Sequence, residues 1–200
     1  MFNNAIKNKV NICGGGLKHF NYINNKVNIL LNGEYLFKNN KKVKYSDYQY
    51  EYFYQRFIYK NNFLKKNNLY FPNYLRYQDP PFFIKTMGLA KKFYALKNVT
   101  YLKGSTYGNI IWTEKKVIDV FKGLKQCLYI SEKMNLNKLY CQIYNRLNSN
   151  DILNIAKIYI KNKTLRILIF KILNNINYNI FKKENFTFIQ NKLYNNISIN

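Results

Sequence analysis

Apolar residues recur at helical spacing through the second half of the chain. From Val117 to Ile176 they return every three or four positions, which predicts four amphipathic helices joined by short turns rich in Asn and Ser. Thr113 is suitably placed to cap the first helix, with Glu114 in its first turn. Similar spacing predicts further helices over Phe83–Leu96 and within Tyr45–Tyr59.

Two segments lack this spacing. Lys26–Leu31 alternates apolar and polar residues, and with Glu34–Lys38 it predicts a β-hairpin around an Asn-Gly turn. Thr100–Trp112 contains Gly104 and Gly108 and predicts a short two-stranded arm.

These patterns predict a mainly α fold, a helical bundle with a short β-hairpin arm and irregular basic N- and C-terminal extensions. Residues 1–50 form the N-terminal extension, and residues 51–176 form the helical domain, with the arm at 100–112. Residues 177–200 form the C-terminal basic extension. Within the first segment, residues 1–25 are polar and basic and predict a flexible arm, in which Gly14-Gly15-Gly16 makes a plain turn.

Charge narrows the functional classes. The chain has 33 Lys and Arg residues against 9 Asp and Glu, a net charge of +24. So large an excess repels itself in a compact fold and indicates an anionic partner, of which RNA is the first candidate. The 34 Asn and 20 Tyr residues are typical of an AT-rich genome, which favours a mitochondrion or a plastid. The same codon bias also favours Lys, so part of the excess reflects the genome.

Residues suited to catalysis are scattered. Asp47 and Glu51 are the best candidate metal pair, four positions apart, but a solvated face pairing with Lys44 or Arg56 is the simpler interpretation. His19 is the only histidine, and the three cysteines form no C-x-x-C motif. We therefore predict no enzyme, no metal site, no cofactor and no small-molecule substrate. No apolar run long enough to span a membrane and no secretory signal is expected.

Lysine doublets lie at the predicted starts, ends and flanks of elements, where a folded protein can present them to phosphates. They are Lys41-Lys42, Lys65-Lys66, Lys91-Lys92, Lys115-Lys116 and Lys182-Lys183.

One segment carries a family resemblance. Ala95-Leu96-Lys97-Asn98-Val99, followed by Gly104-Ser105-Thr106-Tyr107, resembles the A-L-x-N-V and G-G-S-T-Y motifs of ribosomal protein seven of the small subunit. The likeness extends over roughly residues 53–165. It departs from the family in a shorter stretch before Gly104 and in Asn109-Ile110, where the family has V-P.

The resemblance implies a helical bundle in the head of the small subunit that binds ribosomal RNA and contributes to assembly. Its partners would be neighbouring ribosomal proteins, with mRNA and the exit-site tRNA near the arm. Together with the doublets, it predicts an RNA-binding set: Lys65, Lys66, Lys91, Lys92, Lys103, Ser105, Thr106, Tyr107, Lys115, Lys116 and Arg146.

We therefore expect a structural protein of an organellar ribosome, in the mitochondrion or alternatively the plastid. Two alternatives stay open. One is another RNA-binding ribosomal protein of either subunit, since Val27–Asp47 resembles the RNA-binding module of ribosomal protein four through the motif N-I-L-L-N-G. The other is an accessory subunit of an organellar membrane complex, whose basic loops would meet anionic lipid.

Overall fold

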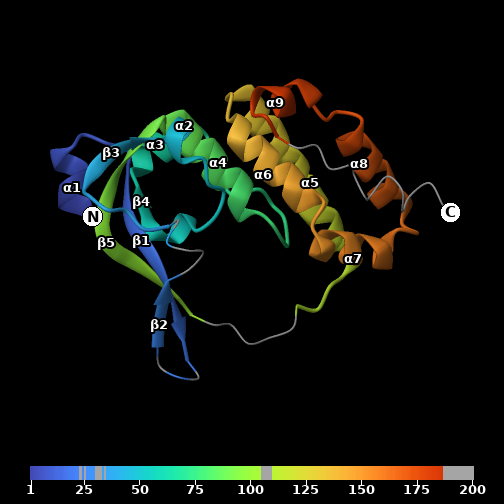
Figure 1. The fold of residues 1–200 in the computed structure, drawn as a ribbon, viewed down its shortest axis with the longest axis horizontal. Coiled ribbons are helices and arrows are strands. Elements are labelled where there is room, and N and C mark those ends of the chain that lie inside the picture. Colours follow the sequence, from blue (N-terminus) through green and yellow to red (C-terminus); the bar gives the residue numbers. More distant parts are fainter. Residues whose placement is uncertain (23, 25, 30–32, 34, 105–109, 187–200) are drawn as a thin grey trace. The chain divides into compact units, whose positions relative to one another are not determined.

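The chain divides into two compact units in the computed structural model, which describes residues 1–22, 24, 26–29, 33, 35–104 and 110–186 (Figure 1). The sheet unit comprises Met1–Tyr48, Tyr52–Tyr70 and Lys85–Ile110. The helical unit comprises Gln49–Glu51, Phe71–Ile84 and Ile111–Asn200.

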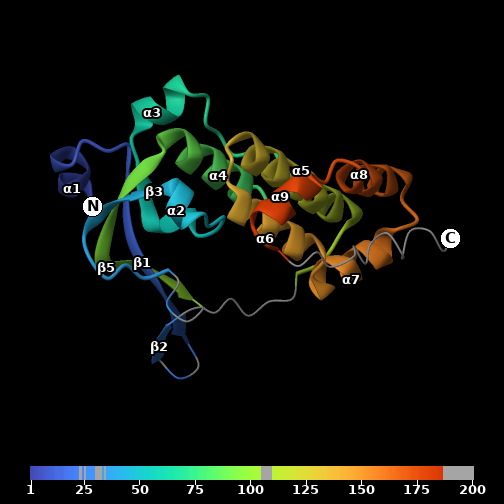
Figure 2. The ribbon, with the colours of Figure 1, turned by 45° about the horizontal axis from the view of Figure 1, so that its top comes forward.

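A five-stranded mixed sheet organises the first unit (Figure 1, Figure 2). Strand β1 (Ile12–Asn21) pairs in parallel with β5 (Lys92–Gly104) and antiparallel with β2 (Lys26–Ile29) and β4 (Phe57–Tyr59). Strand β3 (Lys41–Lys44) pairs antiparallel with the other edge of β5. The prediction of a mainly α bundle is therefore wrong, and the fold is mixed α/β.

The glycine run lies in the middle of the sheet rather than in a turn. Gly14, Gly15 and Gly16 belong to β1, where a Cβ on Gly14 would lie 2.3 Å from Phe57 Cδ1 and one on Gly15 would lie 2.3 Å from Asn98 O. Only glycine allows the neighbouring segments of the sheet unit to approach β1 so closely. The flexible arm predicted for residues 1–25 is wrong, because helix α1 (Phe2–Lys7) and β1 occupy most of it.

The predicted helix over Phe83–Leu96 is half correct. Helix α4 (Asp79–Ala90) ends where Lys91 takes a left-handed φ of 60°, and β5 begins at the next residue. Phe93 and Ala95 are buried two positions apart, a strand spacing that the preceding helical pattern obscured. Residues 100–104 of the predicted arm continue β5, and residues 105–109 lie outside the described part of the chain.

Two more local predictions fail in the sheet unit. The helix expected within Tyr45–Tyr59 is replaced by helix α2 (Tyr45–Tyr48), the 3-10 turn η2 (Tyr54–Arg56) and β4, and helix α3 (Asn61–Lys66) follows. The first strand of the predicted hairpin exists as β2, but it pairs with β1, and residues 35–38 form no strand.

The described part of the helical unit contains the four helices predicted between Val117 and Ile176 and one further helix that was not predicted. It contains α5 (Glu114–Lys133), α6 (Asn137–Leu147), α7 (Asn150–Tyr159), α8 (Lys163–Leu173) and α9 (Tyr178–Lys183). The Thr113 side chain accepts a hydrogen bond from Lys116 N, which confirms its predicted capping role. Helix α9 corrects the predicted extension from residue 177, because its Ile180 and Phe181 are buried. Within the described residues, no helix has both the length and the apolar character needed to cross a membrane.

Candidate nucleic-acid interface

Positive charge is concentrated in the sheet unit. That unit contains 17 Lys and Arg residues and 2 acidic residues, Glu34 and Asp47, whereas the helical unit contains 16 basic and 7 acidic residues. The excess of basic over acidic residues is thus larger in the sheet unit, although that unit is the shorter of the two.

The described lysines of the sheet unit form no ion pair with any described carboxylate. Among the described residues, the two ion pairs are Lys122 with Asp119 at 3.4 Å and Arg146 with Glu51 at 2.6 Å, and both belong to the helical unit. The described lysines of the sheet unit therefore offer their charge to solvent or to an external anion.

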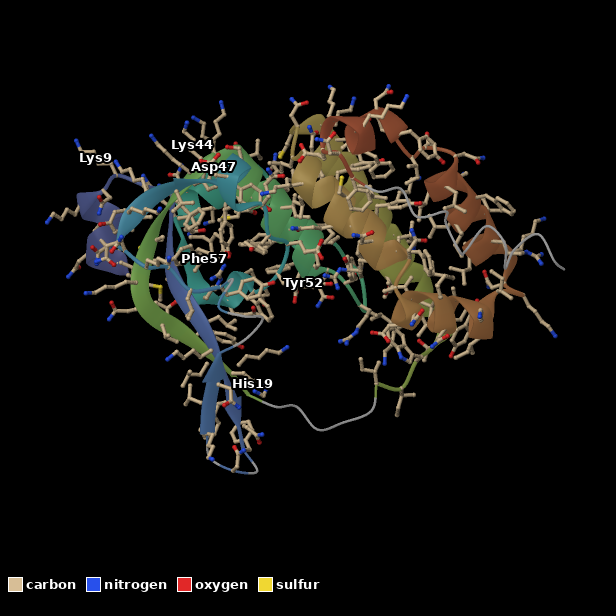
Figure 3. All side chains as sticks on the ribbon, viewed as in Figure 1. Lys9, His19, Lys44, Asp47, Tyr52 and Phe57 are labelled. Atoms are coloured by element: carbon tan, nitrogen blue, oxygen red, sulfur yellow. The ribbon has the colours of Figure 1, made fainter. Side chains whose placement is uncertain are left out.

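Five lysines gather where β3 meets the start of β5. We name the group the lysine edge: Lys41, Lys42, Lys44, Lys91 and Lys92, all exposed. Lys44 lies directly opposite Lys92 in the antiparallel ladder, and Lys42 lies opposite Tyr94. Figure 3 shows Lys44 projecting outward from this edge. Like charges directly opposite one another are destabilising, and a phosphate bound between them would remove the repulsion.

Lysines also protect this edge. Strand β3 has a described partner on one side only, so its outer backbone groups could otherwise pair with another chain. Charged side chains on an edge strand discourage such pairing, which is a structural role compatible with phosphate binding.

The other predicted residues of the sheet unit lie elsewhere in it. Lys65 and Lys66 are exposed in the last turn of α3, where positive charge also favours the helix end. Lys103 is exposed near the end of β5, and its Nζ lies 5.2 Å from the ring centroid of Phe53. Ser105, Thr106 and Tyr107 lie outside the described residues.

Three predicted residues belong to the helical unit. Lys115 and Lys116 lie in the first turn of α5, and Lys116 Nζ donates a hydrogen bond to Ile111 O at 2.8 Å. Arg146 Nε donates to the carboxylate of Glu51, which is 4 % exposed, so Arg146 has a structural partner. The described members of the predicted set are thus divided between the two units.

Sequence analysis missed the role of Arg56. Its side chain is fully buried, and its guanidinium carbon lies 4.8–5.4 Å from the ring centroids of Tyr35, Phe37, Tyr48 and Phe57. Nη1 donates to Tyr35 O at 2.9 Å and to Gly15 O at 3.3 Å. Burial lowers the pKa of Arg56 to about 10. An arginine between aromatic positions at Tyr54 and Phe57 was the available signal, but an acidic partner was expected instead.

Asp47 and Glu51, the candidate metal-binding pair, do not lie on one helix face. Asp47 lies in α2, which ends at Tyr48, so it shares no helix face with Glu51, and Glu51 belongs to the helical unit. Neither Lys44 nor Arg56 is the partner of Glu51. Across the described ranges, no group of three or more His, Cys, Asp or Glu side chains could hold a metal ion. Cys13, Cys127 and Cys141 are buried free thiols.

The fold implied by the family resemblance is also corrected. Ala95–Val99 would end a helix in that family, whereas here it lies inside β5. No protein-family model matches the chain, and no curated protein matches it in sequence.

Proposed function

We propose that this chain is a structural RNA-binding protein of an organellar ribosome, and that the sheet unit makes its main contact with ribosomal RNA. The observation that carries the proposal is the set of sheet-unit lysines without carboxylate partners among the described residues. A unit with this excess of positive charge should bind a polyanion favourably, because each phosphate that it neutralises releases a condensed counterion.

The chemistry of the lysine edge favours backbone binding over base reading. Lysine supplies a point charge rather than the planar fork of arginine, and 29 of the 33 basic residues are lysine. Contacts of this kind position a protein on RNA through phosphates and shape.

The ribosome is proposed on sequence grounds. The abundance of Asn, Lys and Tyr is typical of an AT-rich, organellar gene. A strongly basic chain whose acidic residues are scattered along the sequence suits a ribonucleoprotein. The small subunit, with neighbouring ribosomal proteins as partners, follows from the likeness around Gly104. The mitochondrion is the first location and the plastid the alternative.

Binding to RNA tests the proposal directly. If about 6–10 lysines contact phosphates, affinity for a ribosomal RNA fragment falls by ~10³–10⁵ between about 50 and 200 mM salt. Fluorescence anisotropy of a labelled fragment measures this fall, and a flat salt response contradicts the proposal.

Sedimentation tests whether the chain is part of a ribosomal subunit. Antibodies against the chain should detect it with one ribosomal subunit after high-salt dissociation of organellar ribosomes. Sedimentation with membranes instead would reject the ribosome in favour of an anionic lipid surface.

A further inference from the structure

A pocket of about 520 Å³ opens between α1 and the start of α3 within the sheet unit. Its walls come from Phe2, Ala5, Ile6 and Lys9 on one side and from residues 58–61 on the other, with Val10 and Asn11 between them. We propose that this pocket binds the base of one unstacked RNA nucleotide, with the adjoining phosphate held by Lys9 and Lys60. This inference rests on the proposed function and names the part of the RNA recognised there.

The lining combines the groups that a nucleotide needs. Ala5, Val10 and Ile58 provide apolar surface, and Val10 is 9 % exposed. Asn11 and Asn61 add amide groups that can donate to and accept from a base edge. Lys9 and Lys60 are exposed cations, and none of the described residues that line the pocket carries a carboxylate. An uncharged apolar ligand would leave Lys9 and Lys60 without an anionic partner. A nucleotide supplies both a flat ring for the apolar surface and a phosphate for the two lysines.

An exposed aromatic ring stands in the wall. Phe2 is 69 % exposed and Ile6 is 61 % exposed, although both side chains are large and apolar. Helix α1 contains no buried residue, so few contacts fix the position of its side chains. A base that entered the pocket could stack on the Phe2 ring, which is how unstacked RNA bases are commonly bound.

The backbone at Lys9 supplies a second, independent observation. Lys9 follows α1 with a left-handed φ of 50°, and its N–H and that of Val10 donate to Ile6 O and Ala5 O. Helices α3, α5 and α9 end in the same way, but there the left-handed residue is Asn68, Asn135 or Asn185.

Glycine and asparagine fit that position, and lysine does so at a cost in conformational energy. Lys91 takes a left-handed φ of 60° after α4 as well and lies outside the pocket lining, so the pocket lining, and not the conformation, assigns the role of Lys9. Figure 3 shows Lys9 on the outer side of the sheet unit, where an anion can reach it. At the end of α1 the left-handed position holds a cation that lines the pocket, where Asn or Gly would make a better helix end.

Two RNA probes separate base binding from phosphate binding. One is a single-stranded RNA of about 10 nucleotides, and the other is an abasic strand of the same length and charge. With the full chain, anisotropy should show the RNA binding about tenfold more tightly than the abasic strand, because one base stacks in the pocket. Equal affinities would overturn the pocket proposal, while a steep salt dependence for both would leave the proposed function intact. Failure of both strands to bind would overturn both.

Variants locate the effect. Phe2→Ala should abolish the preference for the base-bearing strand, whereas Tyr70→Ala should keep it, since Tyr70 is an equally exposed ring, at 68 %, outside the pocket. Lys9→Gly should weaken RNA binding several-fold yet raise the melting temperature by about 2–4 °C, because it relieves the left-handed strain.

Two controls complete the experiment. Lys7→Asn removes a charge two residues away, outside the pocket lining, and should change RNA affinity less than Lys9→Gly does. Equal losses would overturn the assignment of Lys9. Displacement of RNA from the wild-type chain, but not from Phe2→Ala, by phosphatidylglycerol vesicles would reassign the pocket to lipid and overturn the proposal.

Discussion

The helical unit and the sheet unit specify their structures in different ways. Helices α5 to α8 can be predicted from the spacing of their own apolar residues, and nearby side chains cap some of them, as where Ser149 caps α7 and Asn162 caps α8. In the sheet unit, β1 pairs with β5 across the chain, so that Cys13 lies beside Tyr94. The helical unit is largely specified by local sequence patterns, whereas the sheet unit depends on pairing between residues far apart in the sequence.

The units also differ in how they compensate charge. In the helical unit, buried Glu51 and Asp119 each have a basic partner. In the sheet unit, the buried charged residue among those described is Arg56, which is surrounded by rings and backbone carbonyls. The helical unit thus pairs its two buried carboxylates with cations of its own, whereas the described lysines of the sheet unit have no carboxylate partner among the described residues.

Neutralising lysines should affect the two units unequally. In the sheet unit we would change Lys41, Lys42, Lys44 and Lys92 to Gln, and in the helical unit Lys157, Lys161, Lys163 and Lys171, all of which are exposed. The first set should weaken RNA binding on the order of 10³ at about 0.1 M salt and make the salt slope shallower by roughly 0.7 per lost contact. Anisotropy titrations at several salt concentrations measure both. Equal losses from the two sets would remove the functional contrast.

Truncating Arg56 should strongly destabilise the sheet unit. Arg56→Ala empties a site enclosed by four rings, and we expect a loss of ~3–5 kcal/mol in the free energy of unfolding. Arg56→Met fills much of the same volume and removes a buried charge, so its cost should be about 1.5 kcal/mol or less. Urea unfolding followed by circular dichroism measures both variants. Equal losses in the free energy of unfolding would show that the guanidinium charge of Arg56, rather than the volume of its side chain, stabilises the sheet unit.

Adding one methyl group should distinguish a strand glycine from a helix glycine. At Gly15 a Cβ meets Asn98 O at 2.3 Å, and Gly15→Ala should cost about 3 kcal/mol. At Gly123 in α5 the Cβ meets Tyr77 Cδ1 at 2.7 Å and Tyr77 O at 2.8 Å, but alanine regains up to ~1 kcal/mol of helix propensity. Thermal unfolding should therefore show a smaller loss for Gly123→Ala, and the reverse order would contradict the close packing of β1.

The same contrast explains which parts of the fold could be predicted. Helices α5 to α8 were predictable because their apolar residues recur at helical spacing and, at α5, α7 and α8, a polar side chain caps the helix start. The sheet unit was not, because the Gly14–Gly16 run is typical of a turn and its role depends on the distant Phe57 and Asn98. The aromatic residues from Tyr48 to Phe57 surround Arg56 rather than one face of a helix, so their spacing predicted the wrong element.

The candidate interface was predictable in kind but not in place. The lysine doublets are visible in the sequence, and Lys91-Lys92 does lie on the lysine edge. Its neighbour Lys44 could not be found, since only strand pairing puts it opposite Lys92. The pocket beside α1 was hidden for the same reason, because it joins residues 2–11 with residues 58–61.

Helix caps provide a smaller test of the local rules. Ser149 Oγ accepts from Ile152 N, so Ser149→Ala should cost about 1 kcal/mol of stability. Helix α3 instead starts after Lys60, which has extended backbone and no side-chain cap, so Lys60→Ser should stabilise the sheet unit by up to ~1 kcal/mol. Hydrogen exchange of the peptides around each helix start would localise both effects. If Lys60→Ser also weakens RNA binding, the missing cap is explained by the pocket.

The smallest expected effect is the contribution of the buried Glu51 carboxyl to the pH dependence of stability. Burial raises its pKa above the ordinary value of 4.5, and Arg146 opposes that rise through its charge and hydrogen bond. The folded chain therefore keeps the proton to higher pH than the unfolded chain, and this group's contribution to stability falls as pH rises from about 4.5. Glu51→Gln should flatten that part of the pH profile, as measured by urea unfolding followed through Trp112, which lies in the helical unit. If the free energy of unfolding falls more steeply with rising pH in the variant than in the wild-type chain, then Arg146 lowers the pKa of Glu51 more than burial raises it. The ion pair with Arg146 would then stabilise the helical unit.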